Sequence, residues 1–191
     1  IDALEIDNVP YLLTANGLHK ESILVSAPVR GNCVCCCSNG ANNAIIYSFD
    51  GFDTTTLGYT KGDHLPDYGI QQVIKGNNVY IAAAGNRILK SKDGLWWKVV
   101  LPPDAVNSNL IKPAFGNNVF VVCGNGYHYV SVDDGETWTQ SSITANLTGI
   151  VYGGDSFLMV GDKTLRISIS SLEAITVNET AMYDVAYAGN K

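Results

Sequence analysis

Short runs of apolar residues alternate with Gly-, Asn- and Asp-containing turns along the chain, and the same pattern recurs four times. Each copy follows an apolar lead-in that ends at a glycine: Gly31, Gly76, Gly116 or Gly153. These glycines are 45, 40 and 37 residues apart, and DVAYAGN at 184–190 repeats the lead-in once more. A period of this length predicts a repeat protein in which each copy is one supersecondary unit.

Each copy reads as four β-strands. Strand A is the apolar lead-in, strand B is the run after the glycine, strand C ends in a serine, and strand D follows the next turn. Four-stranded units of about 40 residues are typical of β-propeller blades. Pro28 and Pro113 fit this interpretation, because both would lie in strand A at the inner edge of a blade, where proline is tolerated.

The two ends of the chain together supply one more copy. Residues 182–188 would form strand A, and residues 1–22 would form strands B to D, with Asn16-Gly17 as a tight hairpin turn. We therefore predict one all-β domain over 1–191, a closed five-bladed propeller whose last blade is completed by both termini. A closed ring leaves no sheet edge free to pair with another chain. The predicted blades span 183–191 plus 1–23, 24–67, 68–108, 109–145 and 146–182.

The stretch GNCVCCCSNG contains four of the five cysteines: Cys33, Cys35, Cys36 and Cys37. A metal or redox site is one interpretation, but a zinc site normally combines cysteine pairs from separate segments. The cluster lies in the register of strand B, where other copies carry apolar core residues, and Cys123 ends that strand in another copy. Free cysteine packs as a small hydrophobe. We predict buried, reduced cysteines without a metal or cofactor, in a protein made in a reducing cytoplasm.

One turn carries a recognisable motif. SVDDGETW (131–138) matches the pattern S-x-D-x-G-x-T-W at every fixed position, and SKDGLWW (91–97) and SFDGFDT (48–54) are degenerate copies. In this motif and its repeat, the chain resembles the Asp-box (BNR-type) propellers, a superfamily that includes sialidases, sortilin-like receptors, photosystem assembly factors and many bacteriophage tail proteins. The resemblance covers almost the whole chain at repeat level and implies a propeller fold.

The resemblance implies a structural role for the motif. Its carboxylate would accept backbone N–H bonds across the turn between strands C and D. Its glycine would permit a left-handed backbone, and its tryptophan would pack between blades. The residues with this expected role are Ser131, Asp133, Gly135, Trp138, Ser91, Asp93, Ser48 and Asp50.

Catalytic constellations are sparse in the sequence. Sialidases use an arginine triad, because the guanidinium fork binds a carboxylate with two hydrogen bonds. The arginines of this chain fall in different strand registers: Arg30, Arg87 and Arg166. The histidines fall in different repeats without metal-binding spacing: His19, His64 and His128. We predict no catalytic residues and expect that the chain is not an enzyme.

A ligand is expected at one face of the ring. In a propeller the B–C and D–A loops meet around the mouth of the channel, and the longest of them here, 57–69, is rich in Tyr, Lys, Asp and His. Rigid aromatic rings and small hydrogen-bonding groups suit recognition of proteins and sugars. The alternative is that this loop is polar only because long loops are exposed to solvent. The candidate ligand-binding residues are Tyr59, Lys61, Asp63, His64, Tyr68, Asn107, Tyr127 and His128.

Charge and hydropathy narrow the partners. The net charge of −6 disfavours nucleic acid, and no apolar run approaches the length of a membrane span, so we expect no membrane insertion. Since the chain begins at Ile1 rather than Met, we expect an excised part of a larger protein, with a possible homo-oligomer formed through the parent chain.

Three classes of function follow. The first is a noncatalytic module that binds a cell-surface glycan or protein receptor, located in a phage tail fibre or another extracellular appendage. The second is a structural or assembly propeller that docks a protein partner. The third is a glycoside hydrolase-like enzyme. A glycan array, a pulldown and a chromogenic glycoside would separate them.

Overall fold

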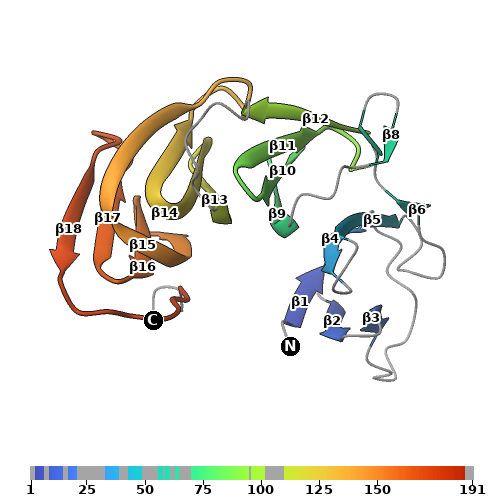
Figure 1. Cartoon of the computed structure of the whole chain (residues 1–191), viewed down its shortest axis with the longest axis horizontal. Coiled ribbons are helices and arrows are strands. Elements are labelled where there is room, and N and C mark those ends of the chain that lie inside the picture. Colours follow the sequence, from blue (N-terminus) through green and yellow to red (C-terminus); the bar gives the residue numbers. More distant parts are fainter. Residues whose placement is uncertain are drawn as a thin grey trace.

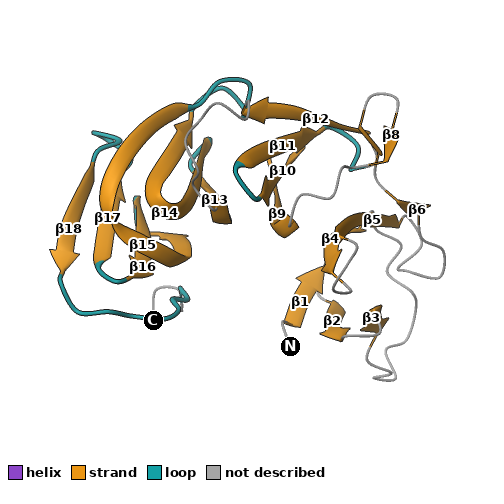
Figure 2. Ribbon diagram, in the orientation of Figure 1, coloured by secondary structure: helices purple, strands orange, loops and turns teal. Residues whose placement is uncertain are grey.

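The computed structural model describes residues 3–6, 9–14, 17–20, 33–38, 43–48, 56–57, 59–60, 63–64, 70–94, 96–101 and 110–187. Side chains are described over 70–94, 96–100 and 110–187. Every element in these residues is a β-strand, as Figure 2 shows. The predicted all-β class is therefore confirmed. Within the same residues, no helix is long and apolar enough to cross a membrane.

Three four-stranded blades follow one another along the chain (Figure 1). Blade I is a meander of β9 (Ile70–Gly76), β10 (Val79–Ala84), β11 (Arg87–Ser91) and β12 (Trp96–Leu101). Blade II comprises β13 (Leu110–Gly116), β14 (Val119–Ser131) and the first half of β15 (Thr139–Gly153). Blade III comprises the second half of β15, β16 (Ser156–Gly161), β17 (Thr164–Ser168) and β18 (Ala174–Asn178).

Two connections that the sequence predicted as loops lie inside continuous strands. The predicted B–C loop at 124–128 is part of β14, and the predicted D–A loop at 142–148 is part of β15. A register shift interrupts the ladder at each place, between Asn125 and Tyr127 and between Leu147 and Gly149. β14 turns back on itself near Gly126, which has φ 77°, so this one long element supplies two consecutive strands of the repeat. The two halves of β15 likewise belong to blades II and III.

Six strands precede blade I in two small sheets. The first contains β1 (Ala3–Ile6), β2 (Val9–Thr14) and β3 (Gly17–Lys20). The second contains β4 (Cys33–Ser38), β5 (Asn43–Ser48) and β6 (Thr56–Leu57). β2 and β3 form a hairpin whose ladder ends at Thr14 and Gly17, so a turn falls within 14–17 as predicted. Gly17 itself belongs to the ladder, which differs from the predicted tight turn centred on Asn16-Gly17. The cysteine cluster lies in a strand as predicted, and β4 lies beside β9 of blade I.

The A–B turns of the blades explain why the repeat could be recognised from the sequence. All three are two-residue hairpin turns in which both central residues have positive φ. This is the type I′ geometry that Asn and Gly adopt most readily. The central pairs and their φ angles are Asn77-Asn78 (45° and 63°), Asn117-Asn118 (48° and 62°) and Gly154-Asp155 (53° and 65°).

The core lies between the blades. Val79, Ile81 and Phe120 belong to the cluster between blades I and II, and Val121 and Phe157 to the cluster between blades II and III. The glycine that ends each strand A is a point of close approach, because an added Cβ would collide with an aromatic ring of the next repeat. These contacts are Gly76 with Phe115, Gly116 with Tyr152 and Gly153 with Tyr187.

The segment after β18 follows the path of another strand A. The Met182 amide donates to the carbonyl oxygen of Gly161 at 2.8 Å, just as the Leu110 amide donates to that of Gly85 at 2.7 Å. Lys112 Nζ lies 3.3 Å from Asp184 Oδ1, and this ion pair ties the segment to β13.

Closure of the ring is not visible in the described residues. Among the described residues, 181–187 form no ladder with β1–β3, and β18 and β1 lie apart in Figure 1. The closed five-bladed ring therefore stays a prediction.

Candidate functional site

The SVDDGETW turn is held by the carboxylate of Asp133. Asp133 Oδ1 accepts hydrogen bonds from Ser131 Oγ (2.8 Å), the Glu136 amide (3.2 Å) and the Thr137 amide (3.0 Å). Asp133 Oδ2 accepts one from Thr137 Oγ1 at 2.5 Å. These bonds, with Thr137 the largest contributor, lower the pKa of Asp133 from 3.8 to about 2. The carboxylate is thus engaged in closing the turn.

The SKDGLWW turn uses the same device with one residue fewer. Asp93 Oδ1 accepts from Ser91 Oγ at 3.0 Å and from the Trp96 amide at 2.9 Å. Ser91 Oγ in turn accepts from the Gly94 amide at 2.8 Å. In blade III, where the aspartate is replaced, Ser168 Oγ bonds Ser170 Oγ at 2.9 Å. A local polar staple therefore follows strand C in all three blades.

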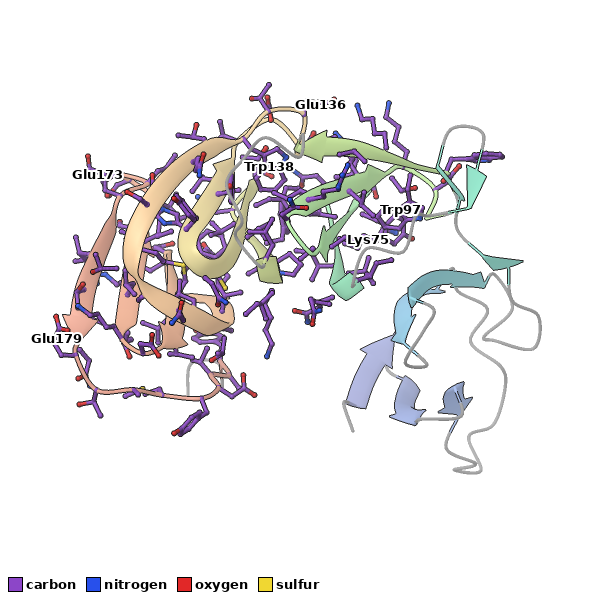
Figure 3. All side chains as sticks on the ribbon, in the orientation of Figure 1. Lys75, Trp97, Glu136, Trp138, Glu173 and Glu179 are labelled. Carbon is purple, nitrogen blue, oxygen red and sulfur yellow. The ribbon has the colours of Figure 1, made fainter. Side chains whose placement is uncertain are left out.

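Tryptophans anchor both aspartate-containing turns to the core. The indole N–H of Trp97 donates to the Gly94 carbonyl at 2.8 Å, and that of Trp138 donates to the Gly135 carbonyl at 3.3 Å. Figure 3 shows Trp138 between blades I and II, where it belongs to the core cluster with Ile81. The two tryptophans therefore hold these turns against the cores of the blades.

An ion-pair network joins blade I to blade II. The carboxylate oxygens of Glu136 form ion pairs with Lys90 Nζ at 2.8 Å and with Lys98 Nζ at 2.6 Å. Figure 3 shows Glu136 where blades I and II meet. Both lysines lower the pKa of Glu136 to about 2, with Lys90 the larger contributor. Lys90 is only 3% exposed, so this carboxylate satisfies a buried ammonium group.

A hollow of about 500 Å³ lies beside the SKDGLWW turn. Its lining residues are Lys90, Ser91, Lys92, Asp93, Trp96, Trp97 and Lys98. Trp97 is buried beneath it, whereas Trp96 is 57% exposed and Lys98 is 56% exposed. The hollow thus combines an exposed indole with three lysine side chains, two of which pair with Glu136. We call this hollow the Trp96 site.

The structure separates the residues that the sequence had grouped on one face. Tyr59 and Thr60 form β7 (Tyr59–Thr60), which pairs with β8 (Asp63–His64) and runs parallel to β12 at Trp96 and Trp97. This pairing extends the outer edge of blade I at the end that carries the SKDGLWW turn. The prediction that this segment is a loop at the B–C end of the blade is therefore wrong for β7 and β8.

Tyr127 and His128 lie elsewhere, on β14 at the B–C end of blade II. His128 is 1% exposed, and neither of its ring nitrogens has a hydrogen-bond partner in the described residues. Burial lowers the pKa of His128, so the ring is neutral and part of the interior. His128 was expected at a ligand-binding surface, but its side chain is buried in the structure. Alternation along β14 turns it toward the same side as Val130, which packs in the core between blades II and III.

The other predicted residues can be placed only in part. The backbones of Ser48, Tyr59, Asp63 and His64 lie in strands, and their side chains are outside the described residues. Asp50, Lys61, Tyr68 and Asn107 lie outside the described residues altogether.

Trp96, Lys92 and Lys98 were not among the candidate residues predicted from the sequence. Two signals pointed to them: the doubled tryptophan of SKDGLWW, and the clustering of four of the chain's 12 lysines and arginines in 87–98. Cys123 is free and buried as predicted, and burial raises its pKa to about 12. Among the described side chains, no group of three or more His, Cys, Asp or Glu residues could hold a metal ion.

Comparison with known proteins identifies the fold. No family model and no curated protein matches the sequence. Among solved structures, the extracellular domain of the hybrid two component system BT4673 from B. thetaiotaomicron is similar with a TM-score of 0.65 and 13% identity, over 96% of this chain and 29% of that one. Virginiamycin B lyase from Staphylococcus aureus gives 0.58 and 18%, over 92% and 68%. YCF48 bound to D1 peptide gives 0.55 and 12%, over 92% and 66%.

These three structures are β-propellers, so the chain has a fold of the β-propeller class. It spans about two thirds of the lyase and of YCF48, and under a third of the BT4673 domain. One of them is an enzyme by name and another is named for a peptide complex. The similarity therefore extends to catalytic and binding propellers alike.

Proposed function

We propose that this chain is a noncatalytic recognition module that binds a cell-surface glycan or protein receptor. In this proposal it is a closed five-bladed Asp-box propeller within a phage tail fibre or a similar extracellular appendage. The single observation that carries the proposal is the Trp96 site, where an exposed indole and lysine side chains line a hollow of about 500 Å³. Ligand sites of 300–1,000 Å³ with aromatic walls and a few charged groups are common.

The frame of the Trp96 site supports binding because it is already ordered. The Trp96 amide is held by Asp93, and the buried Trp97 ring is held by the Gly94 carbonyl. Lys98 is fixed by Glu136 of blade II. A ligand would therefore order few side chains on binding, which preserves affinity.

The proposed closure of the ring rests on exposed apolar side chains at one end of the molecule. Blade III and the segment after it carry most of the large exposed hydrophobic residues of the described chain: Ile175, Val177, Met182, Tyr183 and Tyr187. Apolar clusters of this kind mark a surface that another element covers. In this proposal, strands from residues 1–22 cover this surface by pairing with residues 182–188, because together these two segments complete one more repeat.

A second candidate function is an assembly propeller that docks a protein. It is favoured by the similarity to YCF48, whose structure is described as bound to D1 peptide. A glycoside hydrolase-like enzyme is the third alternative, and the similarity to virginiamycin B lyase keeps a catalytic role among the alternatives.

The test of the recognition proposal is binding of the purified domain to a glycan array and to a panel of bacterial cells. Trp96→Ala should abolish binding while the melting temperature stays within a few degrees of wild type. Val132→Ala is the matched control, because Val132 is 63% exposed in the neighbouring SVDDGETW turn. Equal binding by wild type and Trp96→Ala would reject the Trp96 site, and capture of one protein from lysate without any glycan binding would favour the assembly function.

A further inference from the structure

The Trp96 site is locally positive in an acidic protein. The chain has a net charge of −6, yet three of the seven residues that line the hollow are lysines. Two carboxylates oppose these lysines among the described side chains: Asp93 in the lining, and Glu136, which pairs with Lys90 and Lys98. The described groups therefore leave one positive charge in surplus. Lys92 forms no ion pair with the described residues. An ammonium group is therefore available for an anion.

The aromatic wall adds a second requirement. The Trp96 ring is 57% exposed beside these lysines, and an indole face packs well against a flat apolar surface. A pyranose ring offers such a surface through its C–H groups, together with hydroxyl acceptors at its edge. The ligand that satisfies both requirements carries an anion on a ring with an apolar face.

The geometry of β12 disfavours an extended peptide at this place. Peptides commonly bind by adding a strand to an open sheet edge. The outer edge of β12 at Trp96 and Trp97 is already paired with β7 at Tyr59 and Thr60. The backbone groups that a peptide would need are thus engaged, whereas the side chains of Trp96 and Lys92 remain accessible.

We propose that the Trp96 site binds an acidic sugar, with a pyranose ring on the Trp96 indole and its carboxylate at Lys92. This inference rests on the proposed recognition function and specifies the ligand class of that same site. The proposal predicts different effects for two substitutions. Loss of the Trp96 indole weakens binding of any sugar, whereas loss of the Lys92 charge weakens binding of the acidic sugar alone.

The probe is trigalacturonate, and its trimethyl ester is the control because it keeps the rings and removes the charges. Titration calorimetry of the intact domain should show the acid binding roughly tenfold more tightly than the ester at low salt, with the advantage shrinking as salt screens the charges. Lys92→Gln should weaken the acid about fivefold and leave the ester unchanged. Trp96→Ala should weaken both.

Lys163→Gln is the matched control, because Lys163 pairs with Glu179 at 2.9 Å on blade III, away from the hollow. It should leave binding unchanged. Equal binding of acid and ester, no effect of Lys92→Gln, or no saturable binding of the acid up to about 10 mM would each overturn the acidic-sugar assignment. If the acid fails but Trp96→Ala still abolishes binding to cells or to the array, the recognition function stands and only the ligand class is wrong.

Discussion

The carboxylate of Asp133 should contribute stability in a way that depends on pH. It receives hydrogen bonds from Ser131, Glu136 and Thr137, and they lower its pKa from 3.8 to about 2. A pKa decrease of this size corresponds to about 2 kcal/mol of folding stability. Because the group is exposed, solvent screening reduces this contribution to about 1 kcal/mol. Asp133→Asn should therefore cost about 1 kcal/mol at neutral pH.

The sign follows from the depressed folded-state pKa. The carboxylate stabilises the fold fully above about pH 4, where it is ionised in both states, and the contribution is lost as the pH falls through about 2. Wild type and Asp133→Asn should therefore converge in acid. Glu136 also has a pKa of about 2, but it titrates in both proteins and cancels in the difference.

The assay is urea unfolding of both proteins at neutral pH, near pH 4 and near pH 2. Asp134→Asn is the control, because Asp134 only accepts a hydrogen bond from Asn77 at 2.9 Å and has φ 58°, which asparagine adopts readily. It should change stability by less than about 0.5 kcal/mol. A gap between wild type and Asp133→Asn that stays constant from neutral pH to pH 2 would refute the account of the turn.

Three further predictions follow from the same contacts. Trp138→Ala should cost about 2–3 kcal/mol in urea unfolding, because its partly buried ring fills the space between blades I and II; a loss below about 1 kcal/mol would contradict that packing. Glu136→Gln should lower the free energy of unfolding by about 1–2 kcal/mol, since Lys90 would be left buried without its carboxylate, and an unchanged free energy of unfolding would count against the inter-blade ion pair. Cys123 should react with a thiol reagent only when the fold opens, because burial raises its pKa to about 12; peptide mapping that finds rapid labelling of native protein would exclude this.

The repeat could be predicted from the sequence because its signals are local. Asn77-Asn78 and Asn117-Asn118 favour type I′ turns by themselves, and the serine and aspartate of SVDDGETW close the next turn within five residues. The glycines that end each strand A could also be recognised from the sequence, because they recur at regular intervals. The structural reason for them is a close contact with an aromatic ring of the following repeat. Once these turns are placed, the order of the blades and the direction of their strands are largely determined.

The candidate site could not be predicted because it depends on pairing between distant segments. β7 lies beside β12 although more than 30 residues separate Tyr59 from Trp96, and nothing in the composition of 57–69 specifies that register. The burial of His128 is of the same kind. Its ring is interior only because the second half of β14 bends after Asn125 and packs against blade III.

A comparison of the two aspartate turns explains where the Trp96 site arises. In SVDDGETW, Thr137 bonds Asp133 through both its amide and its hydroxyl. In SKDGLWW the corresponding amide, at 2.9 Å from Asp93, belongs to Trp96, whose ring cannot replace the hydroxyl. The backbone bond therefore keeps the turn closed while the side chain at this position changes from a staple to an exposed indole. The degenerate copy of the motif, rather than the complete one, therefore lies at the surface where we propose that a ligand binds.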